Sequence, residues 1–248
     1  METTHSIPHA THPSVRLPAG TVVDDATAVD RRPSTRRGAA SEADESYRKA
    51  ALFLSKMVRD GTRSVLFCSA RRREGTTTAV LSLAHQLQDG YGLRPLVVEL
   101  NRRKPVLGKL FGLDPARTLD AVLDRLTPAA DCIQVTASGL SIIAGGRVHA
   151  SNPRPRLASG LRRVLSEVEE TFDVVLVDAP PLLTQADAII AGTVVPRLIL
   201  VVEAGRTDCE VLGRVKRELA TEEITIAGSV LVKHKRFIPR WIDWWLAR

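Results

Sequence analysis

The residues with the clearest chemical potential form a short polar turn, Ala70 to Thr77, with the sequence ARRREGTT. It has the length of a phosphate-binding loop, whose usual pattern is glycine, four residues, then glycine, lysine and serine or threonine. Gly75 and Thr77 keep the pattern, whereas Ala70 replaces the first glycine and Thr76 replaces the lysine. In such a loop, backbone N–H groups at a helix start point at phosphate oxygens. The turn therefore predicts a nucleotide site without its main cation.

The ligand expected at this turn is Mg-ATP, bound weakly. The predicted nucleotide-binding residues are Gly75, Thr76, Thr77 and Thr78, and the predicted magnesium ligands are Thr77 and Asp178. Loss of the lysine removes charged hydrogen bonds worth roughly 1.5–3 kcal/mol each, about ten- to a hundredfold in affinity. The alternative is a plain strand-to-helix turn that binds nothing. No other cofactor is predicted.

The elements that must position these groups are buried strands. Apolar runs at 65–67, 95–100 and 173–178 predict strands, and the second and third contain Glu99 and Asp178 at their carboxyl ends. Strands alternate with helices along the chain and most are continuously apolar, which predicts a three-layer α/β domain with a mostly parallel sheet. Because ligands sit beyond the carboxyl ends of parallel strands, the loop and both acids are expected in one crevice.

The remaining organisation has three parts: a disordered arm over 1–42, the domain over 43–235 and a basic amphipathic tail over 236–248. A first helix is expected from Ser41, with Phe53 and Leu54 on its buried face, and Gly61 ends it. Further helices are predicted over 79–87, 106–126 (two short ones), 157–170, 186–191 and 209–220, and further strands over 132–136, 140–144, 198–202 and 224–231.

Composition narrows the class of protein. The chain has 248 residues and a net charge of +7, which favours an anionic partner or simply a basic surface. Three widely spaced cysteines form no paired or zinc-binding pattern, so reduced thiols are expected. The first residues lack the apolar core of a signal peptide, and no run of about 18 apolar residues occurs. We therefore expect a cytoplasmic location, and we expect no nucleic-acid partner.

Three stretches together resemble the bacterial tyrosine kinases, the cytoplasmic kinase domains of capsule and exopolysaccharide chain-length regulators. Ser69 to Thr78 match the family's loop, Ser-Ala-x-x-x-Glu-Gly-Lys-Ser/Thr-Thr, apart from the lysine. Val97 to Pro105 are similar to its second acidic motif, with Glu99 and Asn101 in place of two aspartates. Asp178 to Pro181 match its Asp-x-Pro-Pro ending. The resemblance covers about residues 41–235 and implies the fold of the MinD- and ParA-like P-loop ATPases.

The resemblance also implies roles for individual residues. The first acid of the second motif acts as general base in these kinases, which makes Glu99 the candidate here. The family's oligomerisation helix carries Glu-x-x-Arg-x-x-Arg, which Glu45 and Arg48 match while Ala51 replaces the second arginine. A homo-oligomer and a membrane partner of the polysaccharide co-polymerase type are thus implied. Arg71 to Arg73 and Arg102 to Lys104 are candidate contacts for phosphate or for an acidic partner.

The departures from the family favour a regulatory protein without catalytic activity. Besides the lysine and Asn101, Val232 replaces an asparagine, and the only tyrosines are Tyr47 and Tyr91, away from the C-terminus where the family carries a tyrosine cluster. The chain is therefore interpreted as a pseudokinase regulating capsule or exopolysaccharide production. The alternatives are an active ATP-dependent tyrosine kinase of that pathway and a membrane-positioning ATPase of the MinD type.

The C-terminal tail is the second informative stretch. All three tryptophans, Trp241, Trp244 and Trp245, lie in the last eight residues, among lysines and arginines. A basic amphipathic segment with tryptophans suits the interface of an anionic membrane. The alternative is a helix that packs on the domain or docks to a membrane partner.

Overall fold

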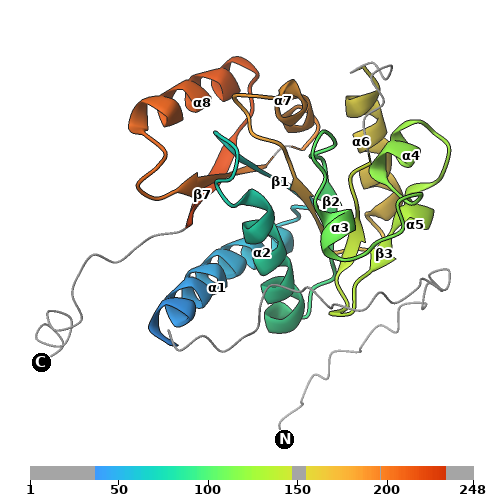
Figure 1. Ribbon diagram of the computed structural model, residues 1–248, viewed down its shortest axis with the longest axis horizontal. Helices are drawn as coiled ribbons and strands as arrows, with labels where there is room; N and C mark the ends of the chain where they lie inside the picture. Colours follow the sequence, from blue (N-terminus) through green and yellow to red (C-terminus); the bar gives the residue numbers. More distant parts are fainter. Residues whose placement is uncertain (1–36, 147–154, 196, 233–248) are drawn as a thin grey trace, which may run out of the picture.

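The computed structural model describes residues 37–146, 155–195 and 197–232, which form a seven-stranded sheet with helices on both faces (Figure 1). The strand order is β3-β4-β2-β5-β1-β6-β7. Neighbouring strands are parallel throughout, except that β3 runs antiparallel to β4. The predicted three-layer α/β architecture with a mostly parallel sheet is confirmed.

The elements follow the predicted alternation along the described chain. The strands are β1 Ser64–Ser69, β2 Pro95–Glu99, β3 Gln134–Val135, β4 Ser141–Ile143, β5 Val174–Asp178, β6 Leu198–Glu203 and β7 Ile226–Val232. The helices are α1 Arg37–Arg59, α2 Thr76–Tyr91, α3 Leu107–Leu110, α4 Leu119–Leu123, α5 Ala129–Cys132, α6 Pro155–Val168, α7 Ala186–Gly192 and α8 Cys209–Thr221.

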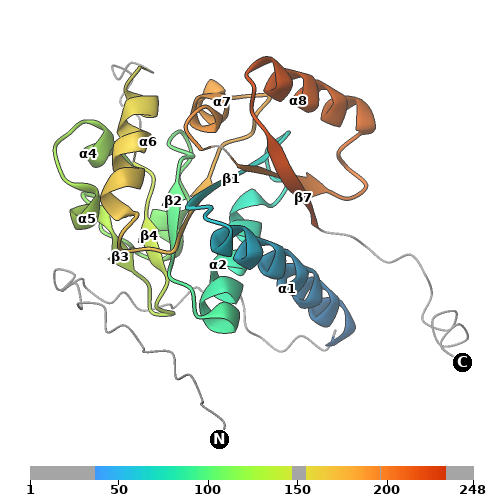
Figure 2. The ribbon, with the colours of Figure 1, turned by 180° about the vertical axis from the view of Figure 1, so that it is seen from behind.

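Both faces of the sheet are buried, because alternate side chains of each central strand enter different cores. In β1, Val65 and Phe67 pack with α1, α2 and α3, whereas Leu66 and Cys68 pack with α4 to α8. The two opposite views place α1 and α2 on the side of the sheet away from α7 and α8 (Figures 1 and 2). Burial on both sides explains why the strands read as continuous apolar runs.

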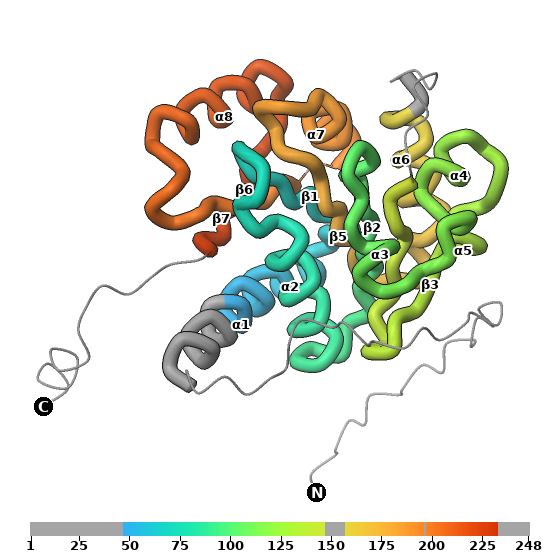
Figure 3. The backbone as a smooth tube through the Cα atoms, viewed as in Figure 1, coloured from blue at the N-terminus to red at the C-terminus, as the bar shows by residue number. Residues whose placement is uncertain are grey.

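The order of the central strands brings three carboxyl ends together. Strand β5 lies between β1 and β2, so Asp178 is paired in register with Phe67 on one side and with Glu99 on the other. The chain then leaves β1 at Ser69 and returns along α2 before entering β2 (Figure 3). The sheet therefore places the turn after β1 beside the ends of β5 and β2.

Two local predictions are wrong. Helix α1 begins at Arg37, four residues before Ser41, so its start does not coincide with the predicted boundary of the arm. Phe53 is 44% exposed, while Ala51 and Leu54 are buried. Adjacent helical residues differ by about 100° around the axis, so Phe53 and Leu54 face different directions. Helix α5 was not predicted, because four residues are too few to show a period.

Several predictions concern parts of the chain outside the described residues. These are the disordered arm up to residue 36 and the tail over 236–248, with Trp241, Trp244 and Trp245. Among the helices that are described, none is both long and apolar enough to cross a lipid bilayer.

Candidate functional site

The turn after β1 has the backbone of an anion-binding loop. Gly75 is the N-cap of α2 and adopts a left-handed conformation with φ of 93°, which glycine accepts without strain. The first bond of the helix runs from the Ala79 N–H to the Gly75 carbonyl at 2.9 Å. The N–H groups of Thr76, Thr77 and Thr78 donate to no described residue, and all three threonines line one cleft. The predicted nucleotide-binding residues therefore present free donors at a helix N-terminus.

A buried glutamate fixes the shape of this loop. Glu74 has no exposed surface. Its Oε2 accepts the Arg71 N–H at 2.9 Å, and its Oε1 accepts the Thr207 hydroxyl at 2.5 Å. Thr207 lies beyond β6, so Glu74 ties the loop to a second connection. Sequence reasoning included Glu74 in the family's loop pattern and missed its contact with Thr207.

The predicted magnesium ligands are in direct contact. The Thr77 hydroxyl donates to Asp178 Oδ2 at 2.7 Å. Asp178 is 1% exposed, and burial raises the pKa of its carboxyl to about 7; the Thr77 hydrogen bond opposes that rise and the charge of Glu99 adds to it. A hydroxyl and a carboxylate are hard oxygen ligands of the kind that magnesium prefers. The pair therefore fits the role that the sequence predicts for it.

Glu99, the candidate base, lies beside Asp178 in the sheet but does not face the cleft. Its side chain has no exposed surface. Oε1 accepts the N–H groups of Val106 and Leu107 at 2.5 and 3.1 Å, and Oε2 accepts the Gly145 N–H at 2.8 Å. Burial raises the pKa of Glu99, although these three hydrogen bonds act to lower it. The expectation that Glu99 opens onto the crevice is wrong, because the start of α3 and the loop after β4 fold over it.

The loop, α2 and the end of β5 line a cleft of about 1620 Å³. Its other walls come from the loop after β2 and from α3. His85 and Ser138 also line it, and His85 Nε2 is 3.0 Å from the Ser138 hydroxyl. Among the candidate anion contacts, Arg72, Arg73 and Lys104 line this cleft.

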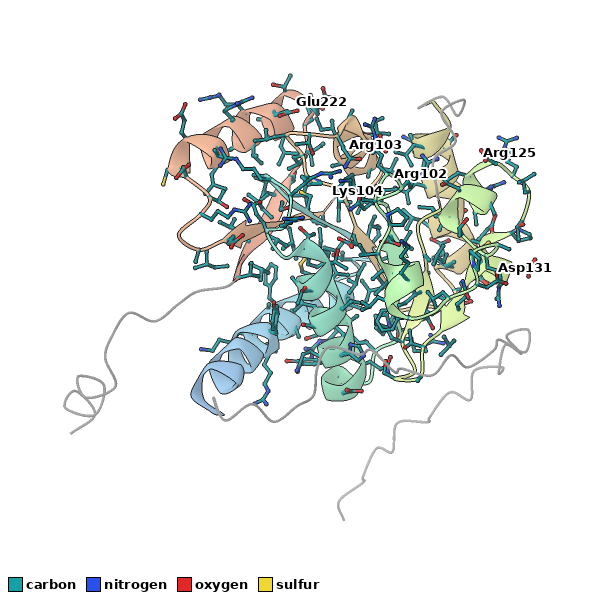
Figure 4. All side chains as sticks on the ribbon, viewed as in Figure 1. Arg102, Arg103, Lys104, Arg125, Asp131 and Glu222 are labelled. Atoms are coloured by element: carbon teal, nitrogen blue, oxygen red, sulfur yellow. The ribbon has the colours of Figure 1, made fainter. Side chains whose placement is uncertain are left out.

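Arg102 is not available to a ligand. It is 8% exposed and forms an ion pair with Asp120, from α4. Figure 4 shows Arg102, Arg103 and Lys104 together on the loop beyond β2, with Lys104 on the side toward α2. The prediction that all three contact an anion is therefore wrong for Arg102, because a carboxylate already compensates its charge.

The candidate oligomerisation residues lie on α1, as predicted from the resemblance. Arg48 is exposed, and Ala51, at the position of the family's second arginine, is completely buried. The side chain of Glu45 lies outside the described residues. The helix thus turns Ala51 into the core, where a charged arginine would be costly.

The sheet order, the loop after β1 and the carboxylate at the end of β5 together define a P-loop NTPase-like fold. The cobyrinic acid a,c-diamide synthase from Mycobacterium smegmatis, solved with an ATP analogue and magnesium, shares this fold with a TM-score of 0.59 at 21% identity, over 75% of this chain and 81% of the other. No protein-family model matches the sequence.

Two further similarities are more specific. Tyrosine-protein kinase YwqD of Bacillus subtilis (strain 168) is 29% identical over 171 residues, 68% of this chain and 71% of YwqD. The kinase domain of VpsO has a TM-score of 0.69 at 26% identity, covering 78% of this chain and 95% of that domain. The chain is a homologue of the bacterial tyrosine-protein kinases, and the resemblance predicted from its motifs is confirmed.

Proposed function

We propose that this chain is a cytoplasmic regulatory protein of capsule or exopolysaccharide production, built on a kinase-type domain that has lost phosphotransfer activity. The homology to bacterial tyrosine kinases supports the pathway. The observation that carries the loss of activity is the position of Glu99, which is sealed from the cleft by three backbone N–H groups. A general base must come within hydrogen-bond reach of the proton that it removes.

The other carboxylates of the cleft do not replace Glu99. Among the described lining residues they are Asp178 and Asp89. Asp178 is engaged by Thr77 at the magnesium position. Asp89 lies on α2 twelve residues beyond Thr77, about 18 Å along the helix axis. Neither carboxylate that lines the cleft is therefore placed as a base beside the start of α2.

Nucleotide binding survives in this proposal, but in weakened form. The free N–H groups of Thr76 to Thr78 would hold the phosphates, and Thr77 with Asp178 would hold magnesium. A magnesium ion held there would offset the negative charge of the phosphates. Thr76 supplies a neutral hydroxyl in place of an ammonium, so the affinity for Mg-ATP should be low.

The test is incubation of the full chain and a polysaccharide co-polymerase-type partner with labelled ATP and magnesium. We expect no phosphotyrosine. The second candidate function, an active tyrosine kinase, is favoured by the intact contact between Thr77 and Asp178. Phosphotyrosine that disappears in both Thr77→Ala and Asp178→Ala would establish that alternative and overturn the regulatory proposal.

The proposal extends to the C-terminal tail and to the first helix of the domain over 43–235. The tail over 236–248, with Trp241, Trp244 and Trp245, is assigned to an anionic membrane surface or to the membrane partner, and Glu45 with Arg48 to contacts between copies of the chain. Sedimentation with anionic liposomes tests the membrane assignment. Deletion of residues 237–248 should abolish cosedimentation, and unchanged cosedimentation would remove the membrane role.

A further inference from the structure

The start of α2 has lost its cation, yet positive charge still surrounds it. The loop after β1 and the loop after β2 contribute six cationic residues, Arg71, Arg72, Arg73, Arg102, Arg103 and Lys104. Their positions differ sharply. Arg102 is buried against Asp120, and neither Arg71 nor Arg103 lines the cleft. Arg72, Arg73 and Lys104 do line it, together with Thr76, Thr77 and Thr78.

We propose that Lys104, assisted by Arg72, supplies the positive charge for a diphosphate group bound at the start of α2, in place of the lysine that Thr76 replaces. This inference rests on the nucleotide site of the proposed function. It places the main cation on the loop after β2, whereas the usual lysine would stand at the end of the loop after β1. The ligand class is a nucleoside di- or triphosphate, recognised through its phosphates.

The charges of Lys104 and Arg72 are not neutralised within the described structure. Neither residue takes part in a salt bridge or hydrogen bond between side chains there, whereas Arg73 has an interaction of its own. The Lys104 N–H donates to the Asn101 carbonyl at 3.2 Å, so these two residues close one turn. Asn101 is neutral, and no carboxylate within the turn competes for the ammonium.

The segment that carries Lys104 is held in place on both sides. Before it, Arg102 forms its buried ion pair with Asp120. After it, the N–H of Val106 donates to Glu99 at 2.5 Å. The backbone between these anchors is therefore fixed relative to the sheet, so binding would have to order the Lys104 side chain but not the loop that carries it. Buried Glu99 and Arg102 thus act as positioning residues for Lys104.

The test is calorimetry on the full chain, with ADP and with inorganic pyrophosphate as probes, in the presence of EDTA so that magnesium does not contribute. Lys104→Ala should raise the Kd for both probes about tenfold or more, as expected for a lost charged hydrogen bond. Arg72→Ala should have a smaller effect in the same direction. Arg103→Ala is the matched control, because it removes the same charge one residue away and should change the Kd less than twofold.

Three outcomes would overturn the inference. These are equal effects of Lys104→Ala and Arg103→Ala, an effect on ADP without one on pyrophosphate, and no binding of either probe by the wild-type chain. None of these binding results would demonstrate phosphotransfer, so the proposal of a regulatory protein without kinase activity would stand. The converse result is also distinguishable. If the chain phosphorylates tyrosine and Lys104→Ala weakens ADP binding, the regulatory proposal is overturned and the role of Lys104 remains.

Discussion

Asp178 and Glu99 end neighbouring strands and are paired in register, yet the structure uses their carboxylates differently. Asp178 borders the cleft and accepts one side-chain hydroxyl, from Thr77. Glu99 accepts three backbone N–H groups from two loops and has no exposed surface. Burial raises the pKa of both carboxyls. One acid keeps the geometry of a metal ligand, whereas the other holds two connections of the fold together.

A motif position therefore does not by itself assign a chemical role. Both acids belong to stretches that resemble acidic motifs of the bacterial tyrosine kinases, and both lie at the carboxyl edge of a parallel part of the sheet. What separates them is the set of atoms that their oxygens contact. Substitutions at the two positions should therefore affect different properties of the protein.

The largest effect is expected for Glu99→Ala, which leaves three backbone N–H groups, two of them buried, without an acceptor. Each unsatisfied group costs roughly 1–3 kcal/mol, so the free energy of unfolding should fall by about 3 kcal/mol or more in urea titrations. Glu99→Gln keeps one acceptor oxygen, so its free energy of unfolding should lie between those of wild type and Glu99→Ala. Glu170→Ala, at an exposed position, is the control and should have little effect. A loss below about 0.5 kcal/mol in Glu99→Ala would contradict the structural role.

Asp178→Asn should change how stability depends on pH. The folded pKa of about 7 lies above the unfolded value of about 3.9, so the folded state binds the proton more tightly. The resulting stabilisation is complete below pH 4 and is lost as the pH rises to 7. Wild type should thus lose roughly 2–3 kcal/mol between pH 5 and pH 8 relative to Asp178→Asn.

Urea unfolding with EDTA at several pH values measures this difference. Asparagine is isosteric and does not titrate, and its side-chain oxygen can still accept the Thr77 hydroxyl. Stability curves that run parallel for the two proteins over this range would show that Asp178 is ionised in the fold throughout.

A smaller effect is expected where Glu74 holds the loop. Thr207→Val removes the hydroxyl that Glu74 accepts and should lower stability by about 1 kcal/mol. It should also speed hydrogen exchange at the Arg71 amide, because that amide donates to the same carboxylate. Thr193→Val, at an exposed hydroxyl that donates to the Ile190 carbonyl of its own helix, should change neither quantity. Unchanged exchange in Thr207→Val would mean that Glu74 is held without Thr207.

Sequence reasoning reached the central strands and the convergence of the loop and Asp178 at one edge of the sheet because both follow from general rules. Strands buried on both faces give continuous apolar runs, and parallel strands bring their carboxyl ends to one edge. The orientation of Glu99 did not follow, since the loops that cover it, at Val106 and Gly145, carry no pattern that predicts their path.

Contacts between distant residues were also missed. Glu74 and Thr207 are 133 positions apart, and Arg102 meets Asp120 across a loop and a helix start. Neither pair has a spacing that a helix or strand period would reveal. The sequence offered six cationic residues as candidate anion contacts, but only the folded chain shows that Lys104 lines the cleft and that Arg102 does not.

The most direct test of the account is to restore the missing cation. Calorimetry should show that Thr76→Lys lowers the Kd for Mg-ATP by ten- to a hundredfold, because the loop and the contact between Thr77 and Asp178 are already formed. Thr76→Ala should leave the Kd near the wild-type value. Tight binding of Mg-ATP by the wild-type chain, with no gain in Thr76→Lys, would contradict the claim that a phosphate-binding loop persists here without its lysine.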